Sequence, residues 1–244
     1  MSMHMTREID SLKRMILSLS AVVEESVQKA VWSIEKLDRT LAQEVIDTDL
    51  EIDRIEVEVE EACLKTLALY QPVAVDLRFI IAVLKINNDL ERIGDLAVNI
   101  ASRTLFLCDA PRRVTPFDFS EICHKTLDML RISLDSLMTM DASRASRVLT
   151  LDDEVDEINR NIFARIFEMI RQSPEDAEVL ISYLSGSRLL ERIADHATNI
   201  AEDVIYMIEG WIVRHGGAFA DENDAGAGAG PEANESGPSQ PSNP

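Results

Sequence analysis

Apolar residues recur every three or four positions along most of this chain. The first such stripe is sustained over nine positions: Ile9, Leu12, Ile16, Leu19, Val23, Val27, Ala30, Ile34 and Leu37. A stripe kept this long is typical of an amphipathic helix packed in a bundle. The same spacing predicts five further helices, over about 41–70, 73–107, 118–140, 142–172 and 174–214.

Residues at the ends of these segments support the boundaries. Asp38 to Thr40 supplies a break with capping side chains, and the second segment stops before Pro72. Asp141 can cap the fifth helix. Ser173 followed by Pro174 and two acids reads as the start of the sixth helix. We expect that helix to end at Gly216-Gly217.

A proline-containing interruption at 109–116 divides the six segments into two groups of three. We therefore predict an all-α fold of two tandem three-helix bundles, one over 6–108 and one over 117–216. Residues 220–244 are rich in Gly, Ala, Pro, Ser and Asn and carry several acids. This composition predicts a disordered acidic tail.

Charge and composition narrow the classes of partner and compartment. The formal net charge is −20 and aromatics make up 5% of residues, which argues against nucleic-acid binding. Three widely spaced cysteines form no disulfide framework, which favours a cytoplasmic, reducing location. No stretch approaches the ~20 apolar residues that would cross a bilayer, so we expect no membrane insertion.

The two halves of the chain share an internal repeat. Residues 90–101 align without a gap with residues 190–201, and nine of the twelve positions are identical. Upstream, Asp49 and Asp53 match Asp152 and Asp156 at an offset of 103 instead of 100. Each half therefore carries two pairs of carboxylates spaced four residues apart, which places the members of a pair on one helix face.

Antiparallel packing would bring these pairs together. In each half the two pairs lie almost equally far from the turn that joins their helices, so all four carboxylates should meet at one level. The first quartet is Asp49, Asp53, Glu91 and Asp95; the second is Asp152, Asp156, Glu191 and Asp195. Asn99 and Asn199 continue the rows and are candidate further ligands or hydrogen-bond partners of the ligands.

Four like charges at one level repel each other unless a cation compensates them. All-oxygen ligation suits hard ions such as magnesium, manganese or iron, so each quartet is a candidate metal site. The competing interpretation is a solvated acidic face that pairs with arginines. Arg92 follows Glu91 by one position, about 100° round the helix, and we expect it to form an ion pair with another helix.

The pattern resembles the PhoU family of bacterial phosphate regulators. The resemblance covers about Thr6 to Gly216, and its most specific elements are Glu-Arg-Ile-Gly-Asp at 91–95 and Glu-Arg-Ile-Ala-Asp at 191–195. It implies metal clusters on both quartets and a homodimer or higher oligomer in the cytoplasm. It further implies a negative regulator that couples the phosphate ABC transporter to a sensor histidine kinase.

Two alternatives from other classes stay open. A carboxylate-bridged metalloenzyme would usually need histidine ligands, and none of the four histidines lies on the carboxylate rows. A purely structural helical adaptor would leave the acidic faces empty. The chain has no glycine-rich phosphate loop, no nucleophile elbow and no Cys/His nucleophile arrangement, so we expect no enzymatic activity.

Overall fold

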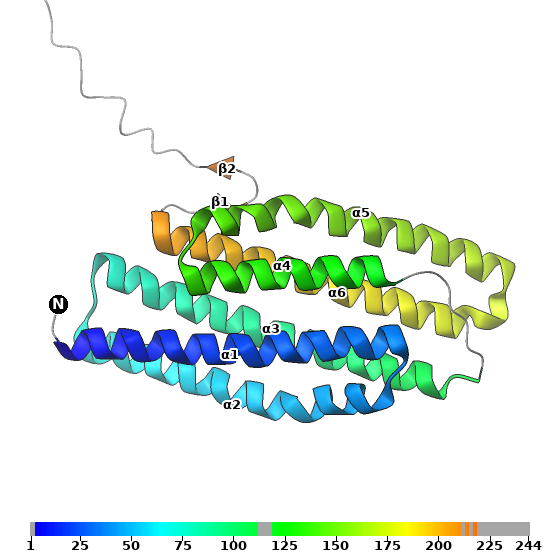
Figure 1. Ribbon diagram of the computed structural model, residues 1–244, viewed down its shortest axis with the longest axis horizontal. Coiled ribbons are helices and arrows are strands. Elements are labelled where there is room, and N and C mark those ends of the chain that lie inside the picture. The colour runs from blue at the N-terminus through cyan, green and yellow to red at the C-terminus, as the bar shows by residue number, and fades with distance from the viewer. Residues whose placement is uncertain (1–2, 112–118, 211–212, 215–216, 219–244) are drawn as a thin grey trace, which may run out of the picture.

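The computed structural model describes residues 3–111, 119–210, 213–214 and 217–218 of the 244-residue chain (Figure 1). Long helices make up nearly all of this part. They are α1 (Met3–Lys36), α2 (Arg39–Tyr70), α3 (Ala74–Asp109), α4 (Ser120–Thr139), α5 (Ala142–Gln172) and α6 (Ala177–Glu209). The predicted all-α fold of two three-helix bundles is confirmed. Most of the expected boundary segment and the whole of the expected tail, 220–244, lie outside the described residues.

Local chemistry fixes most helix ends where the sequence predicts them. The side chain of Asp38 accepts hydrogen bonds from the backbone N–H groups of Thr40 and Leu41, which begins α2. Asp141 caps α5 in the same way by accepting from the N–H of Arg144. Helix α2 ends at Tyr70, before Pro72, with Gln71 in the left-handed conformation. These interactions satisfy backbone groups that a helix end otherwise leaves unpaired.

Both expected ends of α6 are wrong. Residues Pro174–Asp176 form a separate 3₁₀ turn, Ser173 makes no capping hydrogen bond with its side chain, and α6 begins only at Ala177. The helix stops at Glu209 instead of near Arg214, because Gly210 adopts a left-handed φ of 84°. The short strands β1 (Val213–Arg214) and β2 (Gly217–Ala218) then pair with each other.

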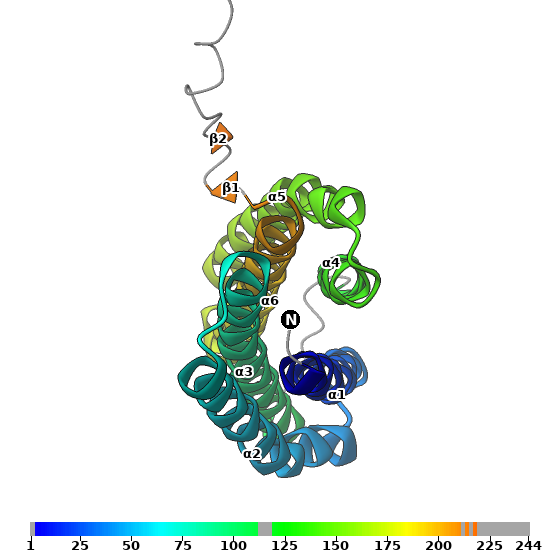
Figure 2. The ribbon, with the colours of Figure 1, turned by 90° about the vertical axis from the view of Figure 1, so that its left-hand side faces the viewer.

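The helices form two layers. Helices α2, α3, α6 and α5 lie side by side in one curved layer, and α1 and α4 pack on its concave side (Figure 2). Helix α1 covers α2 and α3, and α4 covers α5 and α6. Buried apolar side chains from all six helices form one continuous core. Each antiparallel hairpin, α2–α3 and α5–α6, therefore has one face on the core and one face turned outward.

The two bundles join along a seam between the antiparallel helices α3 and α6. Lys85 of α3 forms an ion pair of 2.8 Å with Asp203 of α6, and its ammonium group lies 5.2 Å from the ring centroid of Tyr206. Arg78 donates to the backbone carbonyl of Met207 at 3.2 Å, close to the last turn of α6. Among the described residues, no helix is both long and apolar enough to cross a membrane.

Candidate carboxylate metal sites

The first quartet lies where α2 and α3 approach each other closely. Gly94 sits between the quartet residues Glu91 and Asp95, and a Cβ atom there would meet Cδ1 of Ile52 at 3.1 Å. Ile52 itself is fully buried beside Asp53. The missing side chain therefore lets α2 approach α3 closely beside the two carboxylate pairs. In the second half, Val155 and Ala194 occupy the equivalent positions, and both are buried.

The carboxylates of the first quartet interact electrostatically between α2 and α3. Partial burial raises the pKa of Asp49, and the charges of Asp53 and Asp95 raise it further. The pKa of Glu91 is raised by burial first, then by Asp95, Asp53 and Asp49, while Arg92 lowers it. Asp49 and Glu91 therefore each lie within reach of the charges on the facing helix. Burial and the neighbouring carboxylates both disfavour the charged forms of Asp49 and Glu91, and a bound cation would oppose both effects.

The second quartet is assembled in the same way between α5 and α6. The pKa of Asp195 is raised to about 6, by burial first and then by Asp152, Glu191 and Asp156. Burial also raises the pKa of Asp152, although its carboxylate accepts a hydrogen bond of 3.2 Å from the hydroxyl of Thr198. Thr198 has no counterpart hydroxyl in the first half, where Val98 stands at the equivalent position. The two sites are therefore similar but not identical.

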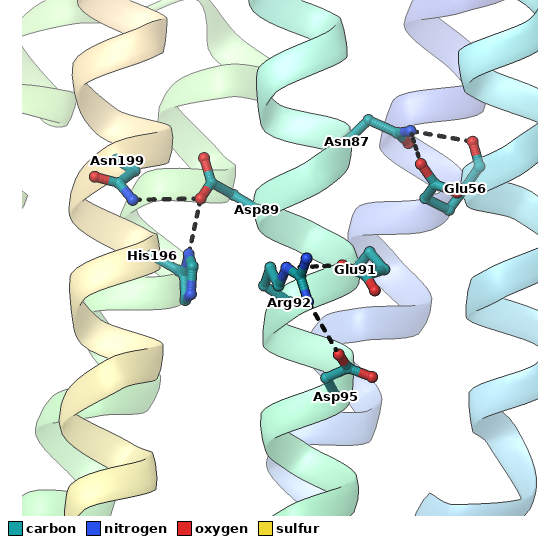
Figure 3. Close-up of polar contacts among 8 residues, drawn as sticks. All are labelled: Glu56, Asn87, Asp89, Glu91, Arg92, Asp95, His196 and Asn199. Carbon is teal, nitrogen blue, oxygen red and sulfur yellow. Dashed lines mark hydrogen bonds and ion pairs between the residues drawn. The ribbon is translucent and has the colours of Figure 1, made fainter.

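The expected role of Arg92 in an ion pair with another helix is wrong. Its guanidinium lies 3.4 Å from the carboxylate of Glu91 and 3.7 Å from that of Asp95, both on its own helix α3 (Figure 3). The side chain of Arg92 is more than half exposed. Exposed contacts of this kind are weak and screened by salt. Arg92 therefore offsets only part of the repulsion within the first quartet.

A polar contact beside each quartet was missed by the sequence reasoning. The amide of Asn87 donates to the carboxylate of Glu56 at 2.9 Å and to its backbone carbonyl at 3.0 Å (Figure 3). Burial raises the pKa of Glu56, and the charges of Glu60, Glu91 and Asp53 raise it further. Glu56 therefore interacts electrostatically with the first quartet. At the equivalent place in the second half, Ser187 donates to Asn159 at 2.9 Å. The available clue was Asn87 itself, four residues before Glu91 on the same row.

The two candidate asparagines do not contact the quartet carboxylates. The amide of Asn99 donates to the backbone carbonyl of Asp95 at 2.9 Å. Asn199 donates instead across the seam to Asp89 at 3.3 Å, and the ring nitrogen Nδ1 of His196 lies 2.8 Å from the same carboxylate oxygen (Figure 3). His196 and Asn199 therefore help to join the two bundles.

The chemistry of the donors fits a hard cation. Each quartet offers four carboxylates whose repulsion an ion would relieve, and neither contains a thiol or an imidazole. In the part of the chain that the structure describes, however, no three His, Cys, Asp or Glu side chains are gathered closely enough to hold a metal ion. The helices thus bring the carboxylates to one level without enclosing a preformed site, and binding would require side chains to turn inward.

Comparison with known proteins places the chain in a family. Residues 16–104 and 119–204 each match the family described as the PhoU domain. The phosphate-specific transport system accessory protein PhoU homolog 1 of Thermotoga maritima is 36% identical over 208 residues, which cover 85% of this chain and 90% of that protein.

Solved structures agree with this assignment. The crystal structure of PhoU from Pseudomonas aeruginosa matches with a TM-score of 0.80 and 34% identity, over 84% of this chain and 99% of that chain. The phosphate transport system regulatory protein PhoU from Streptococcus pneumoniae matches with a TM-score of 0.74 and 27% identity, over 86% of this chain and 100% of that one. The repeat, the fold and these matches agree: this chain belongs to the PhoU family.

Proposed function

We propose that this protein is a cytoplasmic negative regulator of phosphate uptake, which couples a phosphate ABC transporter to a sensor histidine kinase. The observation that carries the proposal is the match to proteins named as accessory to phosphate-specific transport, over nearly the full length of both partners. The regulatory name of the Streptococcus pneumoniae neighbour supports the same role. Coupling to the kinase, the cytoplasmic location and assembly as a homodimer rest on the family resemblance.

Metal binding forms the second part of the proposal. Each quartet would hold magnesium, manganese or iron on Asp49, Asp53, Glu91 and Asp95, or on Asp152, Asp156, Glu191 and Asp195. The support comes from the two carboxylate pairs that face each other in each hairpin, and from the raised pKa values of Asp49, Glu91, Asp152 and Asp195. A bound cation would neutralise this charge and fix α2 against α3 and α5 against α6.

We further propose that the protein acts by contact and not by turnover. The names of the relatives describe accessory and regulatory proteins. The metalloenzyme alternative lacks its usual histidine ligands, because none of the four histidines lies on the carboxylate rows and His196, next to Asp195, is held by Asp89 across the seam. The long outward faces of the helices offer surface on which partner proteins can dock.

A reporter of the phosphate-starvation response tests the regulatory role. A strain that lacks this protein and its paralogues should express the reporter in phosphate-rich medium, and the wild-type gene should restore repression. A variant with Asp95→Asn and Asp195→Asn should restore repression only in part if metal at the quartets supports docking. Normal repression in the deletion strain at high phosphate would rule out the proposed role.

A further inference from the structure

Helix α2 carries an exposed apolar stripe that the fold itself does not use. Leu50, Val57 and Leu64 are spaced seven residues apart, and 78%, 49% and 53% of their respective surfaces are exposed. Seven residues make almost two helical turns, so the three side chains lie in one line over ~21 Å. We call these three residues the α2 stripe. Among the described elements, α2 packs extensively against α1 and α3 alone, and the exposure of the three side chains shows that this outer face is uncovered.

The internal repeat shows that the fold does not require apolar residues here. The positions of α5 that correspond to the α2 stripe hold Asp153, Arg160 and Phe167. Asp153 and Arg160 are exposed and charged, as expected for the outer face of a bundle helix. Only Phe167 is apolar. Single exposed apolar residues are normal on protein surfaces, but an aligned row of them is typical of a contact site.

The surroundings of the α2 stripe are strongly acidic. Between Glu44 and Glu61, the chain has nine acidic residues and a single basic one, Arg54. Arg54 is already paired, because its guanidinium lies 2.7 Å from the carboxylate of Glu58. Glu58 and Glu61 are exposed on one side of the stripe, and Asp53 and Glu60 are exposed on the other. An apolar centre is therefore bordered by negative charge on both flanks.

We propose that the α2 stripe is the docking surface for a basic amphipathic helix of a partner protein. Such a helix would place apolar residues at heptad spacing on Leu50, Val57 and Leu64. Its flanking lysines or arginines would face the acids on either side of the stripe. About four helical turns of the partner would cover the whole row.

The same charges disfavour a second copy of this chain as the occupant. Two α2 helices packed along their stripes would oppose two acidic flanks, and like charges at such a contact are repulsive. The chain as a whole also carries a net charge of −20. A cationic helix instead gains attraction on both flanks, which speeds its association and selects against acidic partners.

Fluorescence anisotropy with a synthetic probe tests the docking surface. The probe is a labelled helical peptide of about four turns, with leucines at heptad spacing and lysine and arginine at the flanking positions. We expect saturable binding to the full-length protein that weakens as salt is raised, because exposed charges are screened. The double variant Val57→Ser/Leu64→Ser should weaken binding at least about tenfold, since two apolar contacts are lost.

Matched controls distinguish binding at the α2 stripe from nonspecific hydrophobic or electrostatic binding elsewhere on the protein. Phe167→Ser removes an apolar residue of similar exposure at the position equivalent to Leu64, and it should leave the affinity unchanged. Glu58→Gln/Glu61→Gln should weaken binding and reduce its dependence on salt. A probe with glutamates in place of its basic residues should not bind.

Several results would overturn the proposal. They are the absence of saturable binding, equal affinity for the wild type and the Val57→Ser/Leu64→Ser variant, and equal binding of the acidic probe. Sedimentation gives a further check: a wild-type dimer that the same variant abolishes would make a second copy the occupant. The peptide is measured against purified protein, so its failure to bind would leave the proposed role in phosphate transport untouched.

Discussion

The close approach of Gly94 to Ile52 predicts that these two positions are energetically coupled. A Cβ atom at position 94 would lie 3.1 Å from Cδ1 and 3.2 Å from Cγ2 of Ile52. Gly94→Ala gains ~1 kcal/mol of helix propensity, but crowding in a packed core costs about 1–3 kcal/mol. We expect a net loss of ~1 kcal/mol. Ile52→Val deletes Cδ1 and should cost a similar ~1 kcal/mol through the space that it leaves.

The double variant should be much less damaging than the two changes added together. The alanine methyl group then occupies the space left by Cδ1, and only the contact to Cγ2 at 3.2 Å has to relax. This pairing reproduces the second half, which has Val155 and Ala194. We expect a loss of less than ~0.5 kcal/mol and therefore a coupling energy of ~1.5 kcal/mol.

Urea unfolding followed by far-UV circular dichroism, in buffer with chelator, measures this cycle. The dependence of the unfolding free energy on urea should be the same for all four proteins, so that the midpoints report stability. Ala194→Gly serves as a control, because it should lose ~1 kcal/mol of helix propensity and, in addition, the packing of its buried methyl group. Strictly additive losses in the cycle would refute the view that residues 52 and 94 together set the distance between α2 and α3.

Three further predictions concern metal, pH and the seam. Asp95→Asn and Asp195→Asn should each weaken metal binding at one quartet, and chelator should lower the melting temperature of the wild type. If the quartets are only solvated faces, the substitutions will not change the metal content and chelator will not change the melting temperature. Acidification from pH 7 to about 5 should stabilise the metal-free protein, because the pKa of Asp195 in the folded state is raised to about 6 and the folded state takes up its proton first. That contribution to stability is lost as pH rises through 6, and Asp195→Asn should remove it in thermal melts. Lys85→Met removes the lysine that pairs with the buried Asp203 and should lower the free energy of unfolding in urea by about 1–3 kcal/mol. Adding Asp203→Leu to this variant should restore most of the lost stability.

Features set by neighbours in the sequence could be predicted. Asp38 and Asp141 cap helices by bonding backbone groups two or three residues away, so the sequence alone places the starts of α2 and α5. The quartets were expected from equal distances to a hairpin turn, and the charges of Asp95 on Asp49 and of Asp53 on Glu91 show that the two pairs lie near each other. Glu56 lies on a neighbouring row of α2, and only its contact with Asn87 of α3 reveals its part in the site.

Features set by contacts between distant segments could not be predicted. Arg78 of α3 donates to the carbonyl of Met207 near the end of α6, a contact between residues more than one hundred positions apart. The side chain of Arg92 turns to carboxylates on its own helix, a choice of rotamer that periodicity does not encode. The seam depends on how the two bundles pack against each other, and no repeat or capping residue in the sequence predicts it.

The seam is where the two halves of the repeat have diverged. Lys85 and Asp203 correspond to Ser185 and Arg103 in the opposite halves. If α3 packed in the same geometry against α3 of another molecule, Lys85 would face Arg103, and two positive charges would meet. If the two repeats were identical, α3 could pair with α3 of one molecule and α6 with α6 of another, and the chains would assemble into an open-ended polymer. Because the seam residues differ between the halves, α3 is complementary to α6 and not to a second α3. The two repeats therefore pack against each other within one molecule.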